Sequence, residues 1–298
     1  MNSDQLFNDL KESLAGKLVF LDDKPEETLE SLLKALWFAA SGNPMSAEVA
    51  VLLPLPVLTV LQIELLNQLI TERINNKPLA HITGRQRFME IDFITDSRAL
   101  IPRKETEILC RRALEISLLL TSTDKNITVI DVCCGAGNLG IAIAAKNPYT
   151  TVHATDISQE AVDLTLENIA FLNLQQKVTA IQGDLFSSVE NDKFISNTHL
   201  IVCNPPYIST GKVKNMNPEI LGKEPVLAFD GGMFGTKIIQ KLILEAPKFL
   251  IKGGWLVFEI GAGQGEFILQ LCQRSNLYEH IEPVFDKNGL IRVISAQK

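Results

Sequence analysis

The sequence has little of what metal-binding, disulfide-bonded or membrane-spanning proteins need. Five cysteines and four histidines are scattered over 298 residues without a Cys-x-x-Cys pair, which is typical neither of a disulfide framework nor of a zinc site. The longest uncharged stretch near the N-terminus, 49–63, has 15 residues and two prolines, whereas a transmembrane helix needs about 20 apolar residues. The first residues lack a secretory signal. We therefore expect a cytoplasmic protein with reduced thiols, no metal and no membrane partner.

Positive charge is also scarce. The formal net charge is −7, and residues 1–80 hold six Lys and Arg against eleven Asp and Glu. Residues 81–112 hold seven against five, a small basic patch that fits either a solvated face or a surface for an anionic partner. A protein that grips long nucleic acids usually presents a basic face. The charge balance therefore argues against a nucleic-acid partner.

What the sequence does contain is apolar periodicity. With 46% hydrophobic and 21% charged residues, its composition is that of a folded chain. The segments 27–40 and 58–74 place leucines at helical spacing, as in Leu29, Leu32, Leu33 and Leu36. We therefore predict a small N-terminal helical domain over 1–75. Residues 76–106 lose this period and are punctuated by Asn, Gly and Pro, which predicts a connecting segment or hairpin.

Residues 107–298 have the pattern of an α/β domain. After a helix predicted over 105–120, strand-like and helical runs alternate, which is typical of a parallel sheet covered by helices on both faces. The predicted strands are 127–132, 151–156, 177–182, 199–204 and 254–260, with a further strand in the C-terminal tail. The predicted helices are 138–147, 158–172, 235–250 and 263–275.

The turn after the first of these strands has the residues of a nucleotide site. It reads Asp131-Val132-Cys133-Cys134-Gly135-Ala136-Gly137, and glycines at a strand-to-helix turn let a ligand approach the backbone. Asp156, at the end of the second strand, is spaced so that its carboxylate can accept hydrogen bonds from both ribose hydroxyls. Asp184, after the third strand, can take an adenine amino group. These two carboxylates favour a nucleotide site over an unliganded turn.

The sequence of this turn alone does not determine which cofactor binds. Gly135, Gly137 and Gly140 complete the Gly-x-Gly-x-x-Gly pattern of dinucleotide sites. Asp131 favours instead a nucleoside that carries an amino acid, because its carboxylate would repel a pyrophosphate and attract an ammonium group. Cys133 and Cys134 are interpreted as small turn residues rather than nucleophiles, because the sequence identifies no partner base.

A second motif follows the fourth strand and indicates the reaction. It reads Asn204-Pro205-Pro206-Tyr207. The two prolines fix φ and remove two N–H groups, so the turn is rigid and rich in acceptors. The Asn204 side-chain oxygen and the Pro205 carbonyl can accept hydrogen bonds from one planar NH₂ group while Tyr207 lies against its face. The motif predicts a site that aligns an amide or an exocyclic amine with an electrophile.

Together, these motifs resemble the class I S-adenosylmethionine-dependent methyltransferases that act on planar nitrogens. Segments 77–84, 87–93, 100–109 and 224–232, with Asp286, Gly289 and Arg292-Val293, further resemble the release-factor glutamine N5-methyltransferases, the HemK/PrmC family, over nearly the whole chain. The resemblance implies a Rossmann-like sheet of seven strands with the last antiparallel, in an S-adenosylmethionine-binding domain over 107–298. It also implies S-adenosyl-L-methionine as cofactor, S-adenosyl-L-homocysteine as product and a peptide chain release factor as substrate.

The resemblance implies roles for individual residues as well. The catalytic residues would be Asn204, Pro205 and Tyr207. The cofactor would be bound by Asp131, Cys133, Cys134, Gly135, Ala136, Gly137, Asp156, Ile157, Asp184, Leu185 and Asn204. The acceptor would be bound by Asn204, Pro205, Pro206 and Tyr207, with Arg103, Glu105 and Glu224 from the segments that resemble the family.

Four positions depart from the family pattern. Cys133 replaces the first glycine of Asp-x-Gly-x-Gly-x-Gly, Lys104 replaces a proline, Met89 replaces a tryptophan and Lys223 replaces an aromatic residue. Because several of these lie in segments expected near the acceptor, a small-molecule amine or amide is an alternative acceptor. Two further alternatives are methylation of adenine N6 in a nucleic acid, against which the charge argues, and a non-catalytic scaffold, which would need none of the motif residues.

Overall fold

The computed structural model describes residues 3–217 and 219–298, which form two compact units. The first unit takes the described residues of segments 1–97, 101–104 and 217–224, and the second takes 98–100, 105–216 and 225–298. Both units are therefore discontinuous in the sequence, and the predicted boundaries at 75 and 106 stay predictions. Within the described ranges, no helix is both long and apolar enough to cross a membrane.

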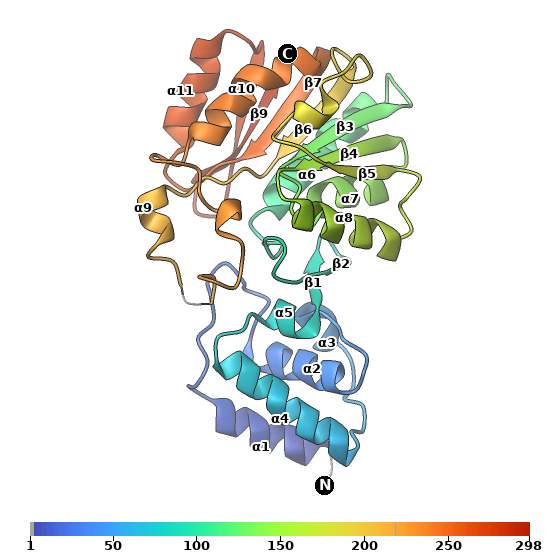
Figure 1. Ribbon diagram of the computed structural model, residues 1–298, viewed down its shortest axis with the longest axis vertical. Coiled ribbons are helices and arrows are strands. Elements are labelled where there is room, and N and C mark those ends of the chain that lie inside the picture. Colours follow the sequence, from blue (N-terminus) through green and yellow to red (C-terminus); the bar gives the residue numbers. More distant parts are fainter. Residues whose placement is uncertain (1–2, 218) are drawn as a thin grey trace. The chain divides into compact units, whose positions relative to one another are not determined.

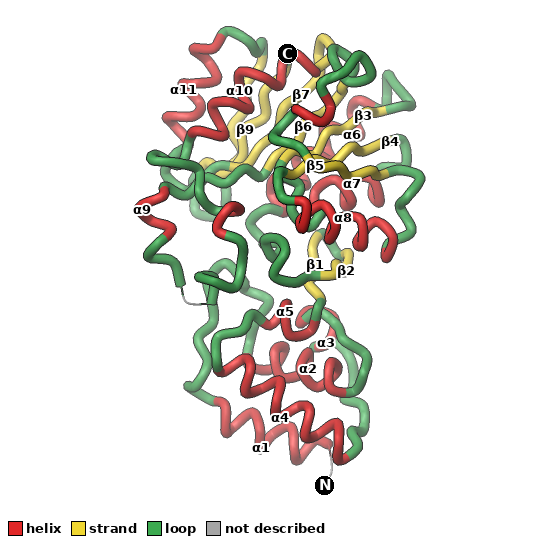
Figure 2. The backbone as a smooth tube through the Cα atoms, in the orientation of Figure 1, coloured by secondary structure: helices red, strands yellow, loops and turns green. Residues whose placement is uncertain are grey.

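The first unit is helical apart from one hairpin, as Figures 1 and 2 show. Its helices are α1 (Ser3–Leu14), α2 (Leu29–Ala40), α3 (Ala47–Ala50), α4 (Val60–Ile74) and α5 (Leu79–Thr83). The strands β1 (Arg85–Phe88) and β2 (Ile91–Ile94) pair antiparallel. Helices α2 and α4 correspond to the two leucine-rich runs of the sequence, whereas α1 was not predicted.

Helix α2 provides much of the core of this unit. At its start the Thr28 side chain accepts a hydrogen bond from the Ser31 N–H, and the Ser31 side chain accepts one from the Thr28 N–H. This capping box fixes where the helix begins. Its fully buried face consists of Leu32, Leu33, Ala35, Leu36 and Trp37. The helical spacing of the leucines in the sequence is thus the spacing of a core-facing stripe.

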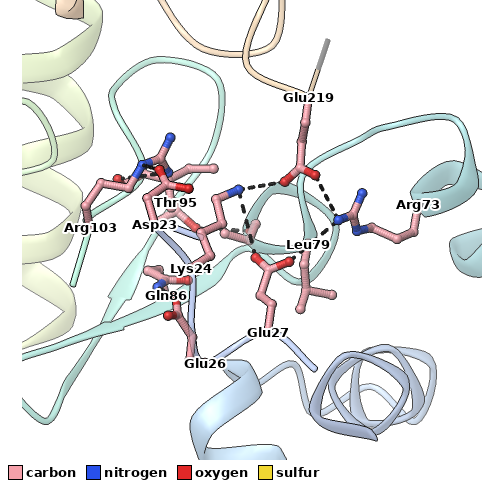
Figure 3. A network of polar contacts seen from close by, with 12 residues as sticks. Asp23, Lys24, Glu26, Glu27, Arg73, Leu79, Gln86, Thr95, Arg103 and Glu219 are labelled. Atoms are coloured by element: carbon pink, nitrogen blue, oxygen red, sulfur yellow. Dashed lines mark hydrogen bonds and ion pairs between the residues drawn. The ribbon is translucent and has the colours of Figure 1, made fainter. Parts of the chain in front are cut away.

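Four of the charged side chains that are buried in this unit form one network (Figure 3). Glu219 accepts from Lys24 Nζ at 2.6 Å and from Arg73 Nη2 at 2.8 Å, and Glu27 lies 3.9 Å and 3.7 Å from the same two groups. The four residues are between 2% and 6% exposed. Two cations therefore neutralise two carboxylates where water does not reach. The chain leaves the second unit after Met216 and returns to it at Pro225. The ion pairs of Glu219 anchor the described residues of this intervening segment in the first unit.

The strands of the second unit form one seven-stranded sheet. They are β3 (Ile127–Val132), β4 (Thr150–Asp156), β5 (Val178–Gln182), β6 (Thr198–Cys203), β7 (Leu250–Glu259), β8 (His280–Phe285) and β9 (Ile291–Gln297), in the order β5-β4-β3-β6-β7-β9-β8. Pairs among β3 to β7 are parallel, and β9 is antiparallel to both its neighbours. The predicted Rossmann-like sheet with an antiparallel last strand is confirmed.

Helices cover both faces of this sheet (Figure 1). Helices α6 (Glu107–Leu120), α7 (Asn138–Lys146) and α8 (Gln159–Phe171) lie on one face, and α10 (Lys237–Phe249) and α11 (Gly265–Ser275) lie on the other. A short helix, α9 (Thr210–Val213), stands in the long connection between β6 and α10. The predicted strands and helices lie within a few residues of the observed ones. Strand β8 was not predicted, because it is an edge strand with no buried apolar run.

Candidate active site

A pocket lies at the carboxyl edge of the parallel strands of the second unit. Its wall comes from the turns after β3, β4, β5 and β6, together with segments 98–100 and 225–230 and Ile238. Parallel strands present their carboxyl ends along one edge, so the loops that follow them converge there. The predicted site residues on this wall are Cys133, Cys134, Gly135, Ala136, Asp156, Ile157, Asp184, Leu185, Asn204 and Pro206. The fold thus brings residues from four separate turns into one pocket.

The turn after β3 leaves open space beside its backbone. Gly135 has a φ of +56°, and a Cβ on it would meet no protein atom within 4 Å. Gly137 instead packs against α8, where a Cβ would lie 2.7 Å from Thr165 Cγ2, and it is not on the pocket wall. Cys133 has a φ of +58°, a conformation that glycine adopts without strain. The position that holds glycine in the family pattern therefore keeps a glycine-like backbone in this chain.

Asp156 ends β4 and holds the glycine turn in place. Its Oδ2 accepts a hydrogen bond from the Gly135 N–H at 2.9 Å, and its Oδ1 accepts one from the Ser158 N–H at 2.9 Å. Burial raises the pKa of Asp156, and these backbone donors oppose the rise. Each carboxylate oxygen can accept a second hydrogen bond. Asp156 can therefore still bind hydroxyl groups in the pocket.

Asp184 and Leu185 form a polar edge and an apolar wall. Asp184 Oδ2 accepts from Lys241 Nζ at 3.0 Å, and both side chains are exposed. Leu185 is buried, and its carbonyl accepts from Thr155 Oγ1 at 2.9 Å, which ties the turn after β5 to β4. An apolar surface beside an exposed carboxylate suits a flat ring that carries an amino group.

Asp131 lies in β3, behind the turn and off the pocket wall. It is fully buried, and its Oδ2 accepts a hydrogen bond from the Gly140 N–H at 2.8 Å. Its Oδ1 has no hydrogen-bond partner among the described residues. Burial raises the pKa of Asp131 to about 7, helped by the nearby Asp156 and opposed by the Gly140 N–H. Its predicted contact with a cofactor stays a prediction.

Replacing Asp131 with asparagine is expected to flatten the pH dependence of stability. An aspartate titrates near pH 4 in an unfolded chain, so the higher pKa of about 7 in the folded protein means that the folded state binds the proton more tightly. That stabilisation is complete below pH 4 and is lost as the pH rises through 7. Between pH 5 and pH 7, the wild-type free energy of unfolding should fall by about 2 kcal/mol more than that of the variant.

Denaturant unfolding at the two pH values measures this difference. Glu27 has its pKa raised to about 7 by burial in the first unit, so it contributes the same trend to both proteins and cancels in the comparison. If the wild-type protein and Asp131→Asn lost equal stability between the two pH values, Asp131 would not titrate as its burial implies.

Asn204 follows β6 and is held by a residue that the sequence did not single out. Its Nδ2 donates a hydrogen bond to Thr106 Oγ1 at 3.1 Å. Thr106 immediately precedes α6 and is buried. Because the two polar atoms of an amide point in different directions, an engaged nitrogen leaves the oxygen to accept elsewhere. Asn204 lies on the pocket wall, so this oxygen could accept a hydrogen bond from a ligand there.

Tyr207 is fixed by contacts at both its hydroxyl and its backbone. The hydroxyl donates to Glu259 Oε1 at 2.9 Å, and the carbonyl accepts from Gln264 Nε2 at 3.1 Å. A Cβ on Gly235 would lie 2.1 Å from the Tyr207 carbonyl oxygen, and one on Gly261 would lie 3.0 Å from Tyr207 Cδ2. Burial, together with the charge of Glu259, raises the pKa of Tyr207. The turn is therefore braced, and the phenol stays neutral.

The three other residues that were predicted to contact the methyl acceptor form ion pairs within the protein. In the first unit, Arg103 Nη2 lies 2.6 Å from Glu224 Oε1, and Arg103 Nε lies 3.0 Å from Asp23 Oδ2. In the second unit, Glu105 Oε2 accepts from Arg292 Nη2 at 2.7 Å. Neither Arg103, Glu105 nor Glu224 is on the pocket wall that the described residues form. Their contact with an acceptor stays a prediction.

Sequence reasoning missed three residues that hold this site together. Glu259 ends β7, so the rule that singled out Asp156 and Asn204, a polar residue at the carboxyl end of a strand, applies to it as well. Gln264 lies in the turn after the same strand. Thr106 has no such signal, because it precedes a helix and meets Asn204 only through the tertiary fold.

Known proteins are similar to this chain in sequence and in fold. Residues 112–234 match the family described as Methyltransferase small domain. The release factor glutamine methyltransferase of Thermodesulfovibrio yellowstonii is 33% identical over 243 residues, which cover 82% of this chain and 84% of that protein. The enzyme of the same name from Bacillus cereus is 32% identical over 230 residues, covering 77% and 80%.

Among solved structures, the catalytic domain of human Mettl16, in complex with the MAT2A 3′UTR hairpin 6, has a TM-score of 0.53 at 14% identity over 69% of this chain and 74% of that one. This likeness concerns the fold alone. The sequence identity to the two enzymes, in contrast, extends over most of both chains. The chain therefore belongs to the release factor glutamine methyltransferase family.

Proposed function

We propose that this protein transfers the methyl group of S-adenosylmethionine to the side-chain amide nitrogen of a glutamine in a peptide chain release factor. One observation carries the proposal: Asn204 stands on the pocket wall with its nitrogen held by Thr106, so that its oxygen can accept a hydrogen bond from an amide N–H. The choice of a release factor as substrate is supported by the names of the relatives. The cytoplasmic location expected from the sequence stays a prediction.

The residues of the pocket fit an adenosyl cofactor. The space beside Gly135 leaves room for a ligand against the backbone, and Asp156 can accept hydrogen bonds from ribose hydroxyls. Leu185 would give the adenine ring an apolar contact, and Asp184 would accept a hydrogen bond from its amino group. When bound, S-adenosylmethionine would supply a methyl group on a positively charged sulphur.

The Asn204–Tyr207 turn would orient the acceptor. An amide nitrogen is a weak nucleophile, because its lone pair is delocalised into the carbonyl. Asn204 Oδ1 and the Pro205 carbonyl would accept hydrogen bonds from its two N–H groups, which favours the positive charge that develops on nitrogen. Holding the reacting atoms in line at about 3 Å can lower the barrier by about 7–11 kcal/mol. The surplus proton would leave to water after the carbon–nitrogen bond has formed.

A methyl-transfer assay tests the proposal. The purified chain would be incubated with labelled S-adenosylmethionine and, in separate reactions, a bacterial release factor, RNA, and small amines and amides. We expect label in the release factor on one glutamine located by mass mapping, with an equal amount of S-adenosylhomocysteine formed. Changing that glutamine to alanine in the release factor should abolish labelling. Transfer to RNA or to small molecules but not to the release factor would overturn the proposal.

A further inference from the structure

A loop in the second unit, 231–235, packs directly against the proline-containing turn that follows β6. A Cβ on Gly231 would lie 2.6 Å from the Pro206 carbonyl oxygen, and one on Gly235 would lie 2.1 Å from the Tyr207 carbonyl oxygen. A larger residue at either position would clash with these backbone atoms. The two glycines therefore allow the loop to touch the turn that would hold the acceptor amide.

Hydrogen bonds hold the backbone of this loop in a tight turn. The Gly235 N–H donates to the Gly232 carbonyl at 3.1 Å, which closes a four-residue turn. The Gly232 N–H donates to Asp230 Oδ1 at 2.9 Å, and the Gly235 carbonyl accepts from Gln264 Nε2 at 3.3 Å. The loop is thus anchored at both ends, and the two residues between its glycines form the tip.

The tip carries two large apolar side chains. Met233 is 79% exposed and Phe234 is 77% exposed, at positions of a turn that polar residues and glycine more often occupy. Single exposed apolar side chains are common, but two neighbours on an anchored turn form a continuous apolar surface. Methionine and aromatic residues are enriched in protein–protein interfaces. This surface, the Met233–Phe234 tip, therefore fits contact with another protein.

The position of the tip indicates which protein that is. Asp230 and Ile238, on either side of the loop, lie on the pocket wall with Pro206 and Asn204. In the proposed reaction, the amide held at Asn204 belongs to a glutamine within a polypeptide, as the names of the relatives imply. The chain on both sides of that glutamine must then lie over the surface around the pocket. A free amide or amine would need no such surface.

We propose that the Met233–Phe234 tip binds the release factor, through apolar contacts with the polypeptide that flanks the methylated glutamine. The inference rests on the proposed function and adds to it residues that determine specificity for a protein acceptor. Neither side chain needs to touch the reacting atoms. Such contacts would stabilise the bound substrate and the transition state equally, so they should affect KM rather than kcat.

Serine substitutions at the tip test this role. In steady-state kinetics with the release factor, we expect the double variant Met233→Ser/Phe234→Ser to raise KM about tenfold or more and to change kcat by about twofold at most. The melting temperature and the affinity for S-adenosylhomocysteine should stay at wild-type values, because both side chains are exposed. A wild-type KM in the double variant would overturn the proposal.

Two matched variants distinguish apolar contact at the tip from a general effect of substitution. Phe234→Leu keeps an apolar side chain and should retain a KM closer to that of the wild type than Phe234→Ser does. Leu119, which is 68% exposed, lies near the end of α6, before β3, and hence at the sheet edge opposite the pocket. Leu119→Ser should keep the wild-type KM. Equal KM values for the leucine and serine variants of Phe234, or an equal rise in Leu119→Ser, would contradict the proposal.

A second copy of this chain is the competing occupant of the tip. Light scattering on the wild-type protein and on the double variant measures the oligomeric state of each. If the wild-type protein were a dimer that the double variant converted to monomers without a change in KM, the tip would bind another copy and the proposal would be wrong.

Calorimetry with the release factor, in the presence of S-adenosylhomocysteine, separates this inference from the proposed function because it needs no methyl transfer. Equal affinity and equal KM for the wild type and the double variant would refute the role of the tip and leave the function standing. A wild-type chain that binds the release factor without methylating it would refute the function, and weaker binding by the double variant would still support the tip. A wild-type chain that neither binds nor methylates it would refute both.

Discussion

Replacing Asn204 with alanine is expected to lower kcat for methyl transfer by about 100-fold or more. The variant removes the Asn204 Oδ1, which would accept a hydrogen bond from the substrate amide N–H. It also removes the Nδ2, which donates to Thr106 and anchors the turn. Both losses disturb the alignment of a weak nucleophile, for which a displacement of about 1 Å already costs about 100-fold. Affinity for S-adenosylhomocysteine should change far less, because Gly135, Asp156 and Leu185 remain on the pocket wall.

Steady-state kinetics with the release factor and calorimetry with S-adenosylhomocysteine measure the two effects separately. A matched control is Asn197→Ala, because Asn197 is exposed and its Nδ2 donates only to the Lys193 carbonyl at 3.0 Å. The control should keep wild-type kcat. If Asn204→Ala kept it as well, the role proposed for the Asn204–Tyr207 turn would be wrong.

Replacing Glu219 with glutamine is expected to lower the free energy of unfolding of the first unit by about 3–5 kcal/mol. In the folded unit, Glu219 accepts from Lys24 at 2.6 Å and from Arg73 at 2.8 Å, whereas Glu27 is more than 3.5 Å from both. Without the Glu219 charge, two buried cations would share one carboxylate. The remaining uncompensated charge, rather than the lost hydrogen bonds, accounts for most of the expected loss.

Fluorescence in denaturant can follow this unit alone. The chain has two tryptophans, and Trp37 lies in the core of the first unit, where its Nε1 donates to the Pro56 carbonyl at 2.8 Å. In a Trp255→Phe background, the signal reports only on Trp37. Glu219→Gln should then unfold at a lower denaturant concentration, whereas Glu72→Gln, which breaks the exposed pair with Lys77, should change stability by about 0.5 kcal/mol at most.

A compensating pair of substitutions distinguishes charge from shape. Lys24→Met combined with Glu219→Leu leaves Arg73 and Glu27 as a neutral pair, and replacing a buried ion pair by apolar residues is often close to neutral in stability. The double variant should therefore recover most of the loss. If Glu219→Gln were as stable as the parent protein, the buried network would not stabilise the unit in the way that its charges imply.

How far sequence reasoning reaches depends on what each element buries. The predicted strand 127–132 coincides with β3, whose residues are almost all buried, so its apolar run is an unbroken signal. Strand β8 is half exposed and contains Pro283, so the same signal is missing. In the first unit, the leucines of α2 indicate its buried face, whereas nothing in the local pattern around Glu219 shows that residues 217–224 belong to that unit.

The sequence by itself determined which polar and glycine residues follow the strands, and therefore that Gly135, Asp156, Asp184 and Asn204 would share one pocket, because parallel strands end at a common edge. Only the tertiary structure decided their partners. Thr106 meets Asn204 across 98 positions, Glu259 meets Tyr207 across 52, and Lys24 meets Glu219 across 195. Backbone preferences are local and can be read over a few residues, whereas these contacts depend on how whole elements pack.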